Sequence, residues 1–251
     1  MDNETVKNYF CKYNNPAVAF SGGVDSSVLL ALAKKYCPSV CAYYVKSQLQ
    51  PDFELRDALL VCEKLGVELN IINCDVLSNS KVRENGINRC YFCKKEMMTR
   101  IVERAKLDGC DAVLEGTNAD DDIFERPGFK AVQELSVLSP LKTLGISKEQ
   151  VRAIARELYL PTYNKSAYAC LATRIPHGSE ISLALLIKIE KAENLMKSFG
   201  FNNFRVRYRE DNTALIQLDG SEFELFTEKR KEIYFGLSEL YSNVYYDLKD
   251  R

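Results

Sequence analysis

The chain has 251 residues, 46% hydrophobic and 27% charged, and these ordinary globular values exclude a disordered, collagen-like or low-complexity protein. Lysine and arginine number 34 against 35 aspartates and glutamates, so the net charge of −1 argues against a broad basic surface for nucleic acid. The apolar runs are far shorter than the ~20 residues of a membrane span, and the acidic residues 1–4 carry no export signal. We expect a cytoplasmic protein with neither a membrane nor a nucleic-acid partner.

Strand-like and helix-like segments alternate along the first half of the chain. Short apolar runs predict strands, and apolar residues at helical spacing between them predict helices. Strands separated by helices form right-handed βαβ units and a parallel sheet, so we expect an α/β, Rossmann-like fold. The predicted strands are residues 16–20, 40–45, 67–73 and 112–114, and the predicted helices are 25–36, 51–65 (closed by Gly66) and 92–106.

The pattern changes in the second half. Ser147 and Gln150 predict a capping box for a helix that reaches Leu158. Residues 161–180 show no periodicity and are predicted to be a linker. Beyond them, helix, strand, strand, helix and strand are predicted at 181–199, 204–209, 213–218, 222–237 and 243–248. We therefore expect an α/β domain over residues 1–165 and a small α+β substrate or oligomerisation domain over residues 166–251.

The sharpest local signal is Ser21-Gly22-Gly23-Val24-Asp25-Ser26-Ser27, between the first predicted strand and the first predicted helix. Glycines let the backbone approach an anion closely, and the N–H groups at a helix start bind phosphate. The serines add hydroxyl donors, and Asp25 can hold Mg²⁺ or a water of its shell. A simple strand-to-helix turn is the alternative explanation. The Walker A pattern and the dinucleotide fingerprint are absent.

This heptad resembles the PP-loop of the ATP pyrophosphatase superfamily, which includes asparagine, GMP and NAD synthetases and tRNA thiolases. The resemblance implies cleavage of ATP between its α- and β-phosphates, with pyrophosphate on the loop and an adenylylated substrate. It places the adenine near Phe20, Ser47, Gly116 and Thr117, in agreement with the general rule for ligands on parallel sheets. The acidic run that ends at Asp122 is either a Mg²⁺ site or a solvated loop.

Further segments resemble one branch of that superfamily. They are Glu115-Gly116-Thr117-Asn118-Ala119-Asp120-Asp121, Arg126-Pro127-Gly128, Ser139-Pro140-Leu141, Ala169-Cys170-Leu171-Ala172-Thr173-Arg174-Ile175-Pro176 and Arg205-Val206-Arg207. In that order they are similar to the LarE family, which inserts sulfur into the nicotinic-acid-derived precursor of the nickel-pincer cofactor of lactate racemase. The resemblance extends from about Ala17 to Arg207.

The arginines fit a substrate that bears carboxylates and a phosphate, because such groups favour planar, permanently charged donors. Arg205 and Arg207 are two residues apart on a predicted strand, so their side chains share one face. Arg174 lies four residues after Cys170. We expect these three arginines to bind the substrate and Arg126 to bind the nucleotide. A solvated strand face and a turn residue are the respective alternatives for the Arg205–Arg207 pair and for Arg126.

Nine cysteines, an odd number without an export signal, predict reduced thiols or ligands. Cys90 and Cys93 form a Cys-x-x-Cys pair at a predicted helix start, and Cys170 stands in the linker. A zinc site requires a second close cysteine pair or nearby histidines, and the sequence has neither near this pair. A thioredoxin-like redox role requires the thioredoxin fold, which a PP-loop domain does not supply. Three thiolates can hold three irons of a [4Fe–4S] cluster and leave the fourth iron open to hydrosulfide. A purely structural role is the alternative.

Together these observations predict an ATP-dependent sulfurtransferase of the LarE type. It adenylylates a carboxylate of the pyridinium-3,5-biscarboxylate mononucleotide and releases pyrophosphate. It then transfers sulfur through a [4Fe–4S] cluster on Cys90, Cys93 and Cys170, and AMP leaves. We expect ATP and Mg²⁺ as cofactors, sulfide or another sulfur donor, and a homo-oligomer. The alternatives are a PP-loop tRNA thiolase, a binding module without turnover, and the sacrificial use of the sulfur of Cys170. His177 suggests no role beyond that of a surface residue.

Overall fold

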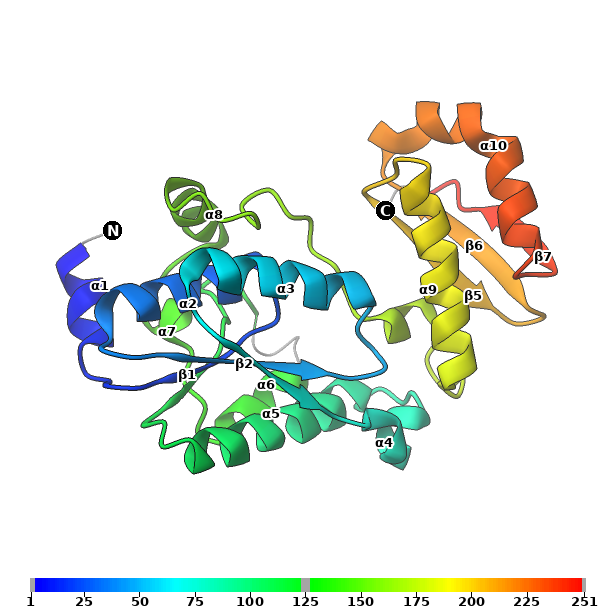
Figure 1. Cartoon of the computed structure of the whole chain (residues 1–251). Helices are drawn as coiled ribbons and strands as arrows, with labels where there is room; N and C mark the ends of the chain where they lie inside the picture. The colour runs from blue at the N-terminus through cyan, green and yellow to red at the C-terminus, as the bar shows by residue number, and fades with distance from the viewer. Residues whose placement is uncertain (1–2, 123–126, 250–251) are drawn as a thin grey trace. The chain divides into compact units, whose positions relative to one another are not determined.

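The computed structural model describes residues 3–122 and 127–249, and it divides into two compact units (Figure 1). Unit 1 contains Met1–Val76 and Asn88–Ala167, and unit 2 contains Leu77–Ile87 and Tyr168–Arg251. Each unit has its own hydrophobic core. The domain division at residues 165 and 166 stays a prediction, to which the structure adds that an early segment of the chain clusters with unit 2.

Unit 1 is built on a four-stranded parallel sheet of order β3-β2-β1-β4. The strands are β1 (Ala17–Ala19), β2 (Cys41–Lys46), β3 (Leu69–Asn73) and β4 (Val113–Leu114). Ala17 pairs with Cys41 on one side and with Val113 on the other. The predicted α/β fold with a parallel sheet is confirmed, and the carboxyl ends of all four strands meet at one edge.

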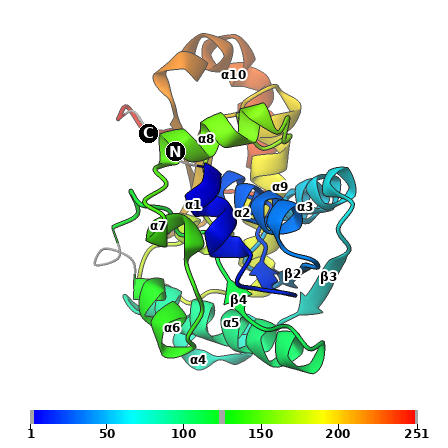
Figure 2. The ribbon, with the colours of Figure 1, turned by 90° about the vertical axis from the view of Figure 1, so that its left-hand side faces the viewer.

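Helices cover both faces of this sheet. One face carries α2 (Val24–Tyr36) and α3 (Asp52–Leu65), and the other carries α5 (Arg89–Leu107) and α6 (Pro127–Glu134) (Figure 1). Helix α8 (Lys148–Glu157) packs on α2 (Figure 2). Because α2 lies between the sheet and α8, its residues are buried almost without a break from Val24 to Ala33. The short helices α1 (Asn3–Phe10) and α7 (Pro140–Thr143) complete the helices of unit 1.

Two predicted helix ends are confirmed in atomic detail. Gly66 closes α3 with a φ of 60°, the left-handed region that glycine adopts readily. At the start of α8 the Ser147 side chain accepts from the Gln150 N–H at 3.2 Å, and the Gln150 side chain accepts from the Ser147 N–H at 2.9 Å. The sequence pattern did not predict α1 or α6, since each is only eight residues long and spans about two turns over which apolar spacing can repeat.

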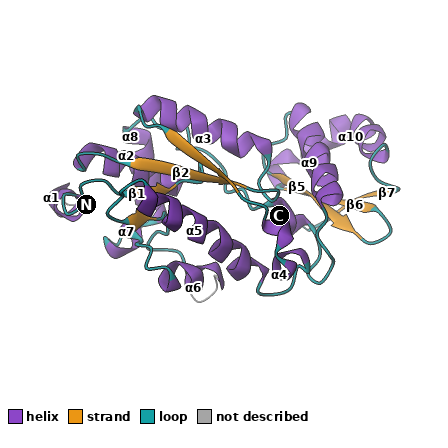
Figure 3. Ribbon diagram, turned by 60° about the horizontal axis from the view of Figure 1, so that its bottom comes forward, coloured by secondary structure: helices purple, strands orange, loops and turns teal. Residues whose placement is uncertain are grey.

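Unit 2 has the predicted order of helix, strand, strand, helix and strand (Figure 3). Strands β5 and β6 are antiparallel, and β7 joins β6 in parallel. Alternate residues of β5 are buried against the helices, as the predicted strand pattern requires. The elements are α9 (Leu183–Ser198), β5 (Phe204–Arg209), β6 (Thr213–Leu218), α10 (Phe223–Ser238) and β7 (Asn243–Tyr246).

The segment Leu77–Ile87, with its short helix α4 (Ser80–Arg83), belongs to unit 2. Asn85 is fully buried and donates from Nδ2 to the carbonyl of Pro176 at 2.8 Å. Its own carbonyl accepts from Gly178 at 3.0 Å and lies 3.3 Å from Nδ1 of His177. His177 therefore contacts this segment. In the described part of the chain, no helix is long and apolar enough to cross a membrane.

Candidate active site

The loop between β1 and α2 has a backbone that only glycine fits. Gly22 has a φ of +73°, and a Cβ there would lie 3.1 Å from the Cβ of Ala58 and from the carbonyl of Glu54. Gly23 is the N-cap of α2 and has an extended backbone. Since glycine carries no side chain to cap the helix, the first N–H groups of α2 face the loop. This is the geometry that binds phosphate.

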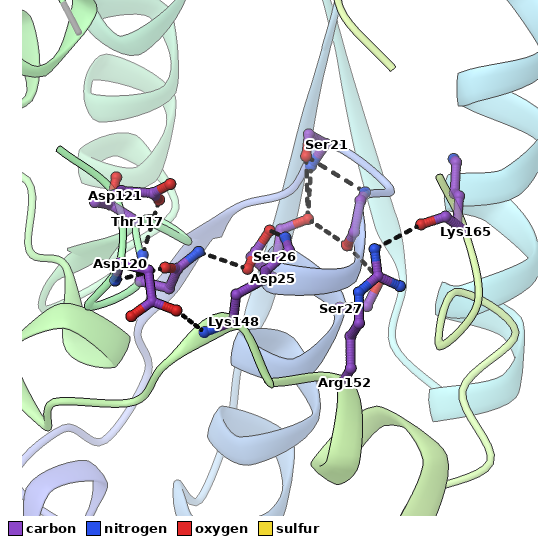
Figure 4. Close-up of polar contacts among 12 residues, drawn as sticks. Ser21, Asp25, Ser26, Ser27, Thr117, Asp120, Asp121, Lys148, Arg152 and Lys165 are labelled. Carbon is purple, nitrogen blue, oxygen red and sulfur yellow. Dashed lines mark hydrogen bonds and ion pairs between the residues drawn. The ribbon is translucent and has the colours of Figure 1, made fainter. Parts of the chain in front are cut away.

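The serine hydroxyls of the loop hold its shape. The hydroxyls of Ser26 and Ser27 donate to the carbonyl of Gly23 at 3.1 and 2.8 Å, and the hydroxyl of Ser26 lies 3.1 Å from that of Ser21 (Figure 4). Ser27 is completely buried, whereas Ser21 is exposed. The loop is therefore preorganised, with a buried Ser27 bonded to its backbone and an exposed Ser21.

Asp25 lies on the first turn of α2 and is already part of a polar network. Its carboxylate accepts from Nδ2 of Asn118 at 3.0 Å and pairs with Nζ of Lys148 at 2.5 Å. The backbone N–H of Lys148 donates to Asp120 at 2.7 Å (Figure 4). This network joins α2, the loop after β4 and the start of α8. Lys148 thus places a cation beside the loop, at a position that the sequence reasoning did not single out.

A second missed cation lies on the other side of the loop. Nζ of Lys165 donates to the carbonyl of Gly22 at 3.1 Å and pairs with Asp57 at 2.7 Å. Arg152 donates to the carbonyls of Tyr163 and Lys165 at 2.8 and 3.2 Å, and so holds the Lys165 segment (Figure 4). Lys165 and Arg152 lie far from the loop in the sequence, and no motif marks either of them as a residue of the loop site. Only the fold shows that they lie beside it.

The residues predicted to surround the adenine follow the strands as expected. Phe20 comes directly after β1, Ser47 after β2, and Gly116 and Thr117 after β4; Phe20, Ser47 and Thr117 are buried. A Cβ on Gly116 would lie 3.0 Å from the backbone nitrogen of Ser26, so this glycine allows the close approach of two loops. The parallel sheet brings these residues to the edge that holds the loop.

The acidic segment after β4 is partly engaged in its own turn. Asp121 accepts from the N–H of Asn118 at 3.1 Å, and Asp122 is exposed. Arg126, which we predicted at the nucleotide, lies outside the described residues. Among the side chains that the structure describes, no three histidines, cysteines, aspartates or glutamates are gathered to hold a metal ion. The Mg²⁺ role of Asp25 and Asp122 stays a prediction.

Cys90 and Cys93 lie on the first turn of α5, three residues apart, and therefore share one face of the helix. Cys90 is exposed and Cys93 is buried. Nη2 of the buried Arg89 lies 3.4 Å from the sulfur of Cys90, so a permanent cation accompanies this thiol. None of the nine cysteines, all within the described residues, is in a disulfide. These two soft, closely spaced donors fit iron.

Cys170, the third predicted ligand, belongs to unit 2 and precedes a short 3₁₀ helix (Leu171–Arg174). It is half-buried. Arg174 is only 1% exposed and forms a bidentate ion pair with Glu193 of α9. The substrate-binding role of Arg174 stays a prediction; in the structure each of its guanidinium nitrogens donates within unit 2. Because the cysteine pair and Cys170 belong to different units, each described by itself, the [4Fe–4S] cluster stays a prediction.

Arg205 and Arg207 share one face of β5, opposite the buried Phe204 and Val206, as the predicted strand requires. The guanidinium of Arg207 contacts Gln217 and donates to the carbonyl of Thr173 at 2.8 Å. This bond ties the arginine face of β5 to the 3₁₀ helix after Cys170. An anion on this face would therefore lie beside the Cys170 loop.

The parallel sheet, the glycine-dependent loop at its carboxyl edge and the helix start behind that loop define an α/β nucleotide-binding domain of the PP-loop type. The comparisons with known proteins agree. The family model for queuosine biosynthesis protein QueC matches residues 16–100. The chain is 34% identical over 227 residues to an uncharacterized protein of Synechocystis sp., a match that covers 90% of this chain and 84% of the relative.

A relative with a named activity is equally similar. The chain is 34% identical over 203 residues to the pyridinium-3,5-bisthiocarboxylic acid mononucleotide synthase of Lactiplantibacillus plantarum, over 80% of this chain and 73% of that enzyme. The chain therefore belongs to the LarE family of ATP-dependent sulfurtransferases, and the resemblance drawn from its motifs is confirmed. The tRNA-specific 2-thiouridylase of Shewanella pealeana is 28% identical and matches 59% of this chain.

Proposed function

We propose that this protein inserts sulfur into the pyridinium-3,5-biscarboxylate mononucleotide. ATP adenylylates a carboxylate of this substrate and pyrophosphate leaves. Sulfur then replaces AMP and forms the thiocarboxylate. The observation that carries this proposal is the preorganised PP-loop in a chain that is 34% identical to a synthase of the bisthiocarboxylic acid. We propose sulfide or another small sulfur donor as co-substrate, and a homo-oligomer as the assembly.

In this proposal the loop and its cations act on the phosphates of ATP. The N–H groups at the start of α2 bind the leaving pyrophosphate, and Lys148 and Lys165 neutralise its charge from two sides. Asp25 and Asp122 would hold Mg²⁺, which would offset the negative charge of the phosphates; Asp25 itself pairs with Lys148. Phosphoryl chemistry needs mainly positioning and charge, and these residues supply both.

The experiment follows the products of ATP. With the mononucleotide, MgATP and sulfide, we expect AMP and pyrophosphate, and Asp25→Asn should lower the rate by ~10²-fold or more because it removes a charge beside the phosphates. Nucleotide chromatography and a pyrophosphate assay measure both. ADP as the product would contradict the proposal, and so would full activity in Asp25→Asn. Tight binding of bulk tRNA would favour the thiolase alternative.

For the sulfur step we propose that Cys90, Cys93 and Cys170 hold a [4Fe–4S] cluster. When bound, such a cluster supplies an iron with an open position for exogenous sulfide. The chain's own contribution is a pair of thiols on one turn of α5, with Arg89 beside Cys90 to offset the negative charge of thiolate ligands. The sacrificial alternative needs Cys170 alone and gives Cys90 and Cys93 no task.

Spectra and mass distinguish these two sulfur chemistries. Protein purified without oxygen should be brown, and Cys90→Ala, Cys93→Ala and Cys170→Ala should each bleach it and abolish sulfur transfer while adenylylation persists. Cys11→Ala, which removes another exposed thiol of unit 1, is the matched control and should keep the colour. In the wild-type protein, Cys170 could instead become ~34 mass units lighter after one turnover, through loss of H₂S. That result would contradict the cluster and support the sacrificial mechanism.

A further inference from the structure

The most completely buried charges of unit 2 lie next to Cys170. Arg174 and Glu193 are 1% and 2% exposed. Nε and Nη2 of the guanidinium contact Oε1 and Oε2 of the carboxylate at 2.8 and 3.1 Å. Burial lowers the pKa of Arg174, but the hydrogen bonds with Glu193 outweigh this effect and leave that pKa raised. The two contacts make the pair a fixed unit of the fold.

The third nitrogen of Arg174 holds the backbone around Cys170. Nη1 donates to the carbonyl of Ala169 and to the hydroxyl of Thr173, both at 2.8 Å. That hydroxyl in turn donates to the carbonyl of Cys170 at 2.8 Å. One buried side chain thus holds the backbone on both sides of Cys170, from which the thiol projects.

Glu193 connects Arg174 to other parts of unit 2 through further hydrogen bonds. It accepts from the hydroxyl of Tyr168 at 2.5 Å and from the N–H of Val206 at 3.1 Å. The Tyr168 ring lies 4.5 Å from the guanidinium carbon of Arg174 and covers the face of the guanidinium. Val206 is the β5 residue between Arg205 and Arg207. The network therefore joins the Cys170 loop to the strand that carries both proposed substrate arginines.

We infer that Arg174 and Glu193 are positioning residues. They hold the Cys170 loop at a fixed position relative to the arginine face of β5, and they do not themselves bind substrate. The inference rests on the proposed role of Cys170 in sulfur transfer. Its physical basis is that each guanidinium nitrogen of Arg174 and both carboxylate oxygens of Glu193 have partners within unit 2. A buried ion pair with such partners contributes more to specifying one geometry than to stabilising the fold. A substrate ligand would instead keep donors directed outward.

The test measures Cys170 in the full-length protein, reduced and freed of iron, by iodoacetamide labelling and site-resolved mass spectrometry. Tyr168→Phe removes one bond to Glu193 and keeps the ring. We expect it to raise the labelling rate of Cys170 about threefold to tenfold, the equivalent of one lost hydrogen bond. Glu193→Gln and Arg174→Lys should raise it further. The internal control is Cys11, and Lys191→Gln, an exposed change on α9, is the control variant.

The kinetics must agree with the labelling. Positioning predicts that Tyr168→Phe lowers kcat for sulfur transfer by a similar factor, with the KM for the mononucleotide and the adenylylation rate unchanged. A raised KM with wild-type labelling of Cys170 would overturn the inference and return Arg174 to substrate binding. If Glu193→Gln does not fold, Tyr168→Phe still decides. If Cys170→Ala retains sulfur transfer, the proposed function of Cys170 fails, while the labelling rates still report on the network.

Discussion

At the scale of single residues, the shape of the candidate ATP site depends on Gly22. Its positive φ and its contacts with Ala58 and Glu54 allow no side chain. The hydroxyls of Ser26 and Ser27 then fix the carbonyl of the next residue, Gly23. The loop therefore has its binding shape before any ligand arrives, which lowers the entropy cost of binding.

Gly22→Ala should abolish ATP-dependent pyrophosphate release, because the methyl group must push the loop away from α3. Gly66→Ala is the matched control: its φ of +60° is equally unfavourable for alanine, but no atom lies within 4 Å of the added Cβ. The control should cost about 1–2 kcal/mol of stability and keep ATP affinity. Urea unfolding and the pyrophosphate assay measure the two effects. If Gly22→Ala and Gly66→Ala lost activity equally, backbone strain would explain both losses, and the contact of the loop with α3 would not be needed.

At the scale of elements, α8 and β5 present functional side chains through their geometry. The capping box places Lys148 at the first position of α8, where it meets Asp25. The alternation of β5 places Arg205 and Arg207 on one face and buries Val206 behind them. A helix cap thus determines where Lys148 lies, and strand alternation determines where Arg205 and Arg207 lie.

Arg205→Ala should raise the KM for the mononucleotide by roughly one to two decades, because charge-assisted hydrogen bonds contribute about 1.5–3 kcal/mol. ATP affinity should not change. Arg209 lies on the same face of β5 but is exposed, so Arg209→Ala is the matched control and should have little effect. Steady-state kinetics with each substrate varied in turn provide the measurement. A parallel loss of ATP affinity would assign Arg205 to the nucleotide.

At the scale of the whole molecule, each unit combines its own core with one part of the proposed reaction. Unit 1 contains the PP-loop and the Cys-x-x-Cys pair, and unit 2 contains Cys170 and the arginine face. Of the six remaining cysteines, three are buried: Cys37, Cys62 and Cys74. Burial raises the pKa of Cys62 to about 12 and that of Cys37 to about 11, so these thiols stay protonated at neutral pH.

The raised pKa of Cys62 predicts alkaline destabilisation. The folded state retains this proton while the unfolded state releases it near pH 9, so the stabilising effect is complete below pH 9 and is lost as pH rises toward 12. Between these values the free energy of unfolding should fall by up to about 1.4 kcal/mol for each pH unit. Urea unfolding of wild type and Cys62→Ala from pH 8 to 11 tests this. Equal pH slopes would contradict it, and Cys11→Ala should retain the wild-type slope.

The sequence by itself determined the parallel sheet, the order of elements in unit 2, the PP-loop and the family. The sheet, the order of elements and the loop follow from hydrophobic periodicity, helix caps and a contiguous heptad, which act over short stretches of chain. The family follows from the resemblance of motifs between Ala17 and Arg207. Helices α1 and α6 are only eight residues long, too short for apolar spacing to repeat over more than about two turns.

Only the tertiary structure decided the partners of those motifs. Lys148 and Lys165 reach the loop across more than a hundred residues, and Glu193 reads in the sequence as one of several charged residues on an amphipathic helix. The motif around Arg174 predicted a substrate ligand, and it could not reveal that each guanidinium nitrogen donates within unit 2. A motif specifies local backbone and side-chain chemistry, whereas burial and long-range ion pairs exist only after the chain has packed.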